Sequence, residues 1–179
     1  MPGMSGSVDN AGRVDDKSVM VGNGPKAGQP LRERVLRSFI SFDLSGLPHD
    51  VEIVEAHLTL VQRDIVGNPH LKELGDVVVD LVDYGASLGG DDFEAPVLME
   101  NVGTLPDSGL LGPKALDVTE AIRRARDRGL SRVQFRLRFS KETDDDGRTD
   151  TAVFDPAVAT QRLELQAAPA GTGARSTTR

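Results

Sequence analysis

Apolar and polar residues alternate with a period of two along most of this chain, which is the pattern of β-strands with one buried face. The clearest case is the segment 131–141, SRVQFRLRFSK. There Val133, Phe135, Leu137 and Phe139 alternate with Arg132, Gln134, Arg136 and Arg138. The pattern predicts a strand that turns its apolar face to the core and its arginines outward.

Two more long strands follow from the same pattern. In the segment 32–44 the inward face is Leu36, Ile40, Phe42 and Leu44, while Phe39 points the other way and is covered by a loop or by an end of the sheet. In the segment 51–61 the inward face is Val54, Ala56, Leu58 and Leu60, with Glu55, His57 and Thr59 outward. The run 77–83, VVVDLVD, predicts a strand buried on both sides, and shorter strands are expected at 18–21, 97–100, 151–154 and 161–166.

A helical pattern occurs once, from Thr119 to Arg128. Thr119 is suited to cap its first turn, and Gly129 is suited to end it in the left-handed conformation. The apolar content is a narrow stripe of Ala121, Ile122 and Ala125. We therefore expect a short helix that lies on the surface.

Several short strands separated by turn signals, with one helix, predict an all-β fold: an antiparallel, jelly-roll-like β-sandwich with one short surface helix. The sandwich domain is expected to span 8–166. Residues 1–7, MPGMSGS, are expected to be disordered or a remnant of cloning, and 167–179 a disordered tail.

Composition narrows the function. The chain has 179 residues, 28 acidic against 21 basic, and a formal net charge of -7, which argues against a nucleic-acid partner. The absence of cysteine excludes disulfides, thiolate zinc sites and a cysteine nucleophile. No apolar run approaches the ~18 residues of a membrane helix, and no signal peptide is visible. Tryptophan is absent and Tyr84 is the one tyrosine, so aromatic platforms for sugars are scarce.

Three blocks stand in an order that suggests a family: SVMVGN at 18–23, RSFISFDLSGLPHDVEIVEAHLTL at 37–60, and ALDVTEAI at 115–122, closed by QRLEL at 161–165. Together they resemble the DNRLRE-type module, a β-sandwich whose members include family 96 carbohydrate-binding modules. The resemblance covers nearly all of 8–166, although the tryptophan that often follows the third block is missing. It implies a non-catalytic, jelly-roll-like module that is extracellular or at the cell surface and attached to something else.

The outward side chains of 131–141, Arg132, Gln134, Arg136 and Arg138, are the first candidate site and are called the arginine row below. Spaced ~6.6–7 Å apart, such side chains form a line of donors for the carboxylates or sulfates of an anionic polysaccharide. Arg34 and Arg63 would extend the row if their strands are neighbours. The alternative is that the arginines pair with nearby Asp and Glu. Tyr84 is a second candidate, for stacking on a sugar, with a buried ring as its alternative.

An acidic loop at 141–155, KETDDDGRTDTAVFD, is the candidate metal site. Asp144, Asp146 and Asp150, with Gly147 permitting a sharp bend, offer the oxygen ligands that calcium prefers. Asp9 or Asn10 would join them if the first and last strands meet there. The alternative is a solvated acidic turn. The histidines His49, His57 and His70 form no ligand pair and are expected at the surface.

No nucleophile elbow, Walker loop or dinucleotide fingerprint occurs, so we do not expect an enzyme. The sequence predicts a non-catalytic binding module that recognises an anionic or cell-surface polysaccharide through the arginine row, with calcium as its one, structural, cofactor. The alternative is a structural or assembly protein, such as a component of a surface layer, a secreted particle or a phage-tail-like particle, that uses the same sandwich for protein contacts.

Overall fold

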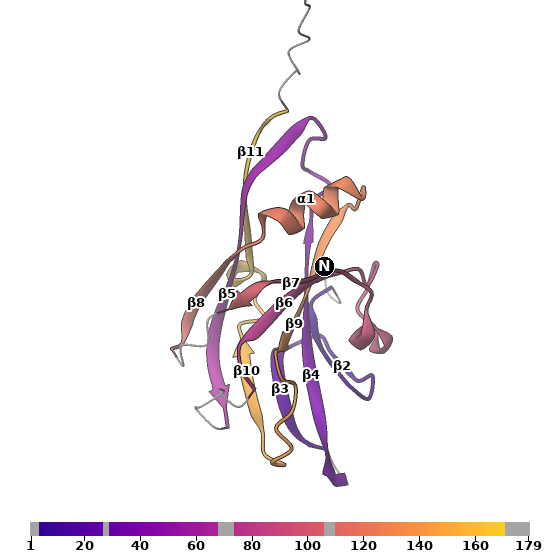
Figure 1. The fold of residues 1–179 in the computed structure, drawn as a ribbon, viewed down its shortest axis with the longest axis vertical. Coiled ribbons are helices and arrows are strands. Elements are labelled where there is room, and N and C mark those ends of the chain that lie inside the picture. Colours follow the sequence, from indigo (N-terminus) through magenta and orange to yellow (C-terminus); the bar gives the residue numbers. More distant parts are fainter. Residues whose placement is uncertain (1–3, 27–28, 68–73, 106–109, 171–179) are drawn as a thin grey trace, which may run out of the picture.

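The computed structural model describes residues 4–26, 29–67, 74–105 and 110–170, apart from the side chains of 26 and 29–32. His70 and the outermost parts of both expected tails, 1–3 and 171–179, lie outside these residues. Figure 1 shows an elongated β structure with its one α-helix, α1 (Thr119–Asp127), near one end. No helix in the described part of the chain is long and apolar enough to cross a membrane.

Within these residues eleven strands form one antiparallel sheet. They are β1 (Gly6–Asp9), β2 (Val14–Asp15), β3 (Val19–Lys26), β4 (Gln29–Asp43), β5 (Val51–Val66), β6 (Val77–Val82), β7 (Val97–Leu105), β8 (Gly112–Asp117), β9 (Arg132–Phe139), β10 (Asp150–Phe154) and β11 (Arg162–Pro169). Two short 3₁₀ helices, η2 (Gly90–Glu94) and η3 (Val158–Thr160), lie between strands. The expected all-β class with one short surface helix is confirmed.

The sheet curls into a half-barrel. Its strand order is β7–β6–β9–β4–β3–β10–β5. Strand β5 is long enough to pair with three strands: β10 and then β11 lie along one of its sides, and β8 lies along the other. Strand β1 pairs with β4. The curl brings β7 and β8 into contact without a shared ladder: a Cβ at Gly103 would lie 2.5 Å from Leu116 Cδ1. The fold is therefore sandwich-like, and its two facing layers belong to one continuous sheet.

The core follows the predicted alternation. Val133, Phe135, Leu137 and Phe139 are all buried, and all six residues of β6 are buried. Phe39 faces away from this core and packs with Tyr84, Val8 and Ala95 in a second cluster, covered by β1 and the segment around η2. The covering predicted for Phe39 is thus confirmed.

The inward face predicted for 51–61 is wrong at Val54, which is 52% exposed. The β5–β11 register passes from Glu55 opposite Gln166 to Ile53 opposite Ala167, which leaves Val54 as the extra residue of a β-bulge. Because a bulge shifts the alternation by one, Ile53 is buried in its place. Val54 is left pointing outward beside α1.

The helix occupies the predicted position and buries Ala121, Ile122 and Ala125 as expected. Gly129 ends it at φ +70°, and the Leu130 N–H donates to the Ala125 carbonyl. The capping role predicted for Thr119 is wrong. Its hydroxyl accepts the Ala56 N–H at 2.9 Å and so joins the helix to β5.

The ordered chain is wider than 8–166 at both ends. Strand β1 begins at Gly6, within the segment expected to be disordered, and Met4 is 7% exposed. At the other end β11 pairs with β5 through Pro169. These additional residues are ordered because their backbones pair with neighbouring strands, and a pattern of side chains does not reveal such pairing.

Candidate functional site

The arginine row lies on β9, as predicted, but its arginines converge on a carboxylate inside the protein. Asp80, in the middle of β6, is directly opposite Arg136 and is 0% exposed. Arg136 Nη2 and Arg138 Nε each lie 2.9 Å from Asp80 Oδ2. Burial raises the pKa of Asp80, but hydrogen bonds from Arg138, from the Asn101 N–H and from Arg136 outweigh it, so this pKa lies below its ordinary value.

The other two members of the row are also engaged within the protein. Gln134 accepts the Tyr84 N–H and donates to the Gly85 carbonyl, both at 2.8 Å. Arg132 donates to Ser41 Oγ at 2.8 Å and lies 3.8 Å from Asp43. The side chains of Arg132, Arg136 and Arg138 are 22%, 7% and 19% exposed. The structure therefore matches the alternative given in the sequence analysis, in which the arginines pair with nearby Asp and Glu. The side chains of the arginine row mainly contact acidic and polar groups of the protein itself.

Neither proposed extension continues the row. Arg34 lies on β4, which does neighbour β9, but outside the residues 38–43 that pair with it. Arg34 pairs with Asp9 at 2.8 Å. Arg63 lies on β5, which β4, β3 and β10 separate from β9. Neither arginine therefore extends the arginine row.

Tyr84 is buried and unavailable for stacking on a sugar. Its ring packs edge-on against Phe39, with centroids 5.6 Å apart, and its hydroxyl donates to the Met4 carbonyl. Burial raises the pKa of this phenol above its ordinary value. Tyr84 therefore serves the second core cluster, the alternative role considered from the sequence.

The acidic loop brings together two of its three predicted ligands and a third residue from another element. Asp144 and Asp146 join Glu33 of β4, with one oxygen from each of the three lying within 4.8 Å of the others. Asp150 is not in this group; it lies on β10 opposite Asn23. We call Glu33, Asp144 and Asp146 the acidic cluster.

Nor are Asp9 and Asn10 part of the acidic cluster. Asp9 accepts the N–H groups of Ala11 and Arg13 and the Arg34 guanidinium. The Asn10 amide donates to the backbone carbonyl of Glu33. Both residues organise the turn after β1.

The loop is held onto β4 by its own contacts. Glu33 Oε1 accepts the Gly147 N–H at 2.8 Å, and Glu33 Oε2 accepts the Thr143 hydroxyl and Asn23 Nδ2. Nearer the start of the loop, Arg37 binds Glu142 through two hydrogen bonds of 2.6 and 2.9 Å. The acidic cluster is therefore positioned by a fixed loop conformation.

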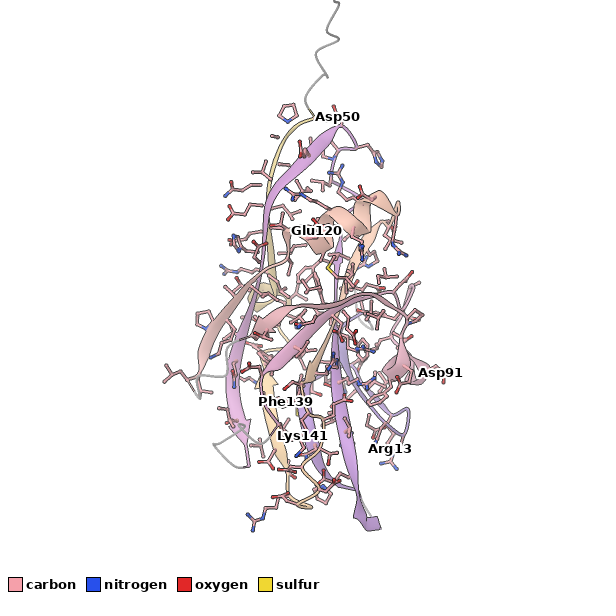
Figure 2. All side chains as sticks on the ribbon, in the orientation of Figure 1. Arg13, Asp50, Asp91, Glu120, Phe139 and Lys141 are labelled. Carbon is pink, nitrogen blue, oxygen red and sulfur yellow. The ribbon has the colours of Figure 1, made fainter. Side chains whose placement is uncertain are left out.

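A groove of about 740 Å³ lies between α1 and strands β5, β7 and β8. Its walls combine apolar side chains, including the outward Val54, with three carboxylates and one guanidinium. The lining residues are Val54, Glu55, Met99, Val102, Leu116, Asp117, Val118, Thr119, Glu120 and Arg123. Figure 2 places Glu120 near the α1 end of the molecule and Lys141, where the acidic loop begins, toward the other end. The groove is thus net acidic and partly apolar.

Three arginines of α1 hold the walls of the groove in place. Arg123 donates to the Ile53 carbonyl at 2.9 and 2.7 Å, and Arg126 donates to the Val51 carbonyl at 2.6 Å. On the opposite wall, Arg124 donates to the Leu98 carbonyl of β7 at 3.0 Å. Beyond β8, the helix therefore takes the place of a strand partner along the edge of β5.

His57 adds a titratable group beside the groove. It lies between Asp117 of β8 and Glu164 of β11 in register, and its Nε2 is 2.7 Å from Glu55 Oε1. The hydrogen bond to Glu55 raises the pKa of His57, and the charges of Glu55, Asp117 and Glu164 add to this effect. His49, also expected at the surface, lies in the exposed turn after β4.

No known family model matches the chain, and no curated protein is significantly similar to it. The resemblance to the DNRLRE-type module therefore stays a prediction. What is established is the class: in its described residues this is an all-β protein built on one curled antiparallel sheet with one short α-helix.

Two features of these sites could not be read from the sequence. Glu33 is far from the acidic loop in the chain, and no spacing rule connects them. Val54 is exposed because of a β-bulge, and the regular alternation of the residues around it gives no sign of that bulge. Asp80 did carry a signal, because an aspartate inside the run VVVDLV needs a buried cation as partner.

Proposed function

We propose that this protein is a non-catalytic binding module that holds an extended, basic and partly apolar segment of another protein in the groove beside α1. The observation that carries the proposal is the composition of the groove: the exposed Val54 and the half-buried apolar side chains beside it are framed by Glu55, Asp117 and Glu120. This favours the protein-contact alternative over recognition of an anionic polysaccharide, which these carboxylates would repel.

The edges of the sheet support a protein ligand. Within the described residues β7 pairs with β6 alone and β8 with β5 alone, so each has one side without a strand partner. Extended segments of other proteins commonly bind by adding hydrogen bonds to such edges, while pockets receive alternate side chains. A groove bordered by two strand edges suits an extended peptide.

The groove lining supports a role without catalysis. Its one hydroxyl, that of Thr119, accepts the Ala56 N–H and donates to Asp117 Oδ1 at 2.6 Å. The hydrogen bond from Thr119 lowers the pKa of the Asp117 carboxyl, so this carboxylate is a weak base, and the hydroxyl is already engaged in joining α1 to β5. The groove is therefore equipped to bind rather than to cleave.

The proposal is tested by selecting peptides from a displayed random library on the immobilised protein, with a panel of acidic polysaccharides titrated in parallel at low and high salt. We expect the selected peptides to be basic with interspersed apolar residues, and their binding to weaken as salt rises. Binding of polysaccharides alone, with no enriched peptide, would contradict the proposal.

A matched pair of variants assigns the site. Val54→Arg places a positive charge on the groove wall, and we expect it to weaken binding of a selected peptide about tenfold or more. Val14→Arg is the control, because Val14 is similarly exposed, at 42% against 52%, but lies on β2 outside the groove. Equal affinities for the two variants would place the binding site elsewhere.

A further inference from the structure

We propose that the acidic cluster, together with Asn23, is a calcium-binding site. It lies at the end of the molecule away from α1, where the loop after β9 meets β3 and β4 (Figure 1). The inference is independent of the proposed function, since the groove and the acidic cluster share no residue.

The three carboxylates are close enough to share one cation. One oxygen from each of Glu33, Asp144 and Asp146 lies within 4.8 Å of the others, so the negative charges repel one another unless a positive charge lies between them. Arg148 Nε is 3.8 Å from Asp146 Oδ2, but the Arg148 side chain is 82% exposed. A divalent cation bound by all three carboxylates would offset their mutual repulsion directly.

Asn23 supplies a second, separate observation. The residue is 1% exposed, and its Nδ2 points into the acidic cluster, 2.8 Å from Glu33 Oε2 and 3.0 Å from Asp144 Oδ1. Its carbonyl oxygen, Oδ1, is buried and has no hydrogen-bond partner among the described residues. A buried amide oxygen left in this state is unusual in a folded protein and calls for an explanation.

A bound cation explains both halves of the Asn23 amide. Half a turn about the Cβ–Cγ bond exchanges Oδ1 and Nδ2, which presents the oxygen to Glu33 and Asp144. That arrangement is favourable only when a cation lies among the three oxygens. The turned amide nitrogen then faces the other way, with Asp150 as its cross-strand neighbour in the β3–β10 ladder.

The donor set selects calcium. It comprises carboxylate and amide oxygens with the Thr143 hydroxyl beside them, and no histidine or cysteine, so metals that prefer nitrogen or sulfur are disfavoured. Calcium accepts several protein oxygens in irregular geometry, whereas magnesium demands a strict octahedron and keeps its water. Asp145 and Gly147, at φ +60° and +71°, give the loop the curvature to surround an ion.

The first test compares the melting temperature of chelator-treated protein with and without added calcium, alongside a calorimetric titration. For free calcium about 100-fold above its Kd, the melting temperature should rise by roughly 5–10 °C. Asp144→Asn and Asp146→Asn should abolish both the rise and the heat of binding. Asp145→Asn is the matched control: it removes one charge from the same loop, outside the acidic cluster, and should leave the response intact.

The second test addresses Asn23. Asn23→Asp removes the amide that donates to Glu33 and Asp144 and adds a fourth negative charge, so the calcium-free protein should melt at a lower temperature than wild type. Calcium should restore the melting temperature and bind about tenfold or more tightly, since an additional carboxylate ligand faces the ion. If Asn23 merely braced the loop, calcium would fail to restore this variant.

Three results would overturn the proposal: no heat and no change in melting temperature in wild-type protein, a response that survives Asp144→Asn together with Asp146→Asn, or an equal response to magnesium. None of these results bears on peptide binding in the groove, so the two proposals stand or fall separately.

Discussion

Asp80 determines what its neighbouring strand presents to a ligand. A carboxylate at 0% exposure requires compensation, and Arg136 and Arg138 supply it from the face of β9 that alternation assigned to solvent. The sequence pattern identified the strand and its core-facing side correctly, but the other side, predicted to face solvent, is covered, with Gln134 and Arg136 both buried. It could not identify the partner, because β6 and β9 are far apart in the chain and an alternating pattern does not say which strands pair.

The first prediction concerns this buried pair. Asp80→Asn should lower the free energy of unfolding by about 3–5 kcal/mol, because it leaves the Arg136 guanidinium buried without a counter-charge. Urea denaturation measures the change. Glu100→Gln is the control: Glu100 is 3.9 Å from Arg138 but 75% exposed, so its loss should cost less than about 1 kcal/mol. If both variants unfold alike, Asp80 does not anchor the arginine row.

The second prediction concerns pH. Since Glu55, and then Asp117 and Glu164, raise the pKa of His57 above its unfolded value of ~6.5, the protonated ring stabilises the folded state. This contribution is complete below the unfolded pKa and is lost as pH rises through the higher folded pKa. His57→Gln should remove that part of the pH dependence of the melting temperature. An NMR titration midpoint for His57 at or below ~6.5 in the wild type would contradict this account.

At the scale of elements, α1 completes the sheet. Its apolar stripe is narrow, as the sequence indicated, and much of its attachment comes from Arg123, Arg124 and Arg126 donating to carbonyls of β5 and β7. Sequence analysis placed the helix to within one residue at its end. It could not foresee the arginine contacts, because their acceptors are backbone atoms of strands distant in the chain.

The third prediction follows from these contacts. Arg123→Ala should lower the free energy of unfolding by about 1.5–3 kcal/mol, the usual value of hydrogen bonds made by a charged donor. Arg128→Ala, at the exposed C-cap of the same helix, should cost less than about 0.5 kcal/mol. Thermal or chemical denaturation of the two variants side by side gives the comparison. Equal losses would show that α1 is held by its apolar stripe alone.

The strands differ in whether the pattern of apolar and polar residues predicts them. Strands β4, β5 and β9 were predicted because they alternate, and β6 because it is apolar except for Asp80. Strands β1, β2 and β8 were not, since they are short and two contain glycine or proline. The bulge at Val54 reversed the predicted face of β5 at its start and thereby contributed an apolar side chain to the groove.

At the scale of the whole molecule, the two proposed sites lie at opposite ends of one curled sheet. The groove beside α1 depends on where β7 and β8 approach each other, and the acidic cluster depends on how the loop after β9 crosses β3 and β4. Both arise from the closure of the sheet, a property of long-range pairing. The composition indicates few aromatic side chains that could stack on sugars. Because Tyr84, the one tyrosine of the chain, is buried, it does not serve in that role.

The central claim is that the ligand surface is the acidic groove and not the arginine row. The most direct measurement is an NMR map of backbone amide shifts during titration with a selected basic peptide and, separately, with an acidic polysaccharide. The account predicts that the peptide shifts amides of β5, β7, β8 and the start of α1, and that the polysaccharide shifts none. Shifts confined to β9 and its neighbours, saturating with the polysaccharide, would contradict it.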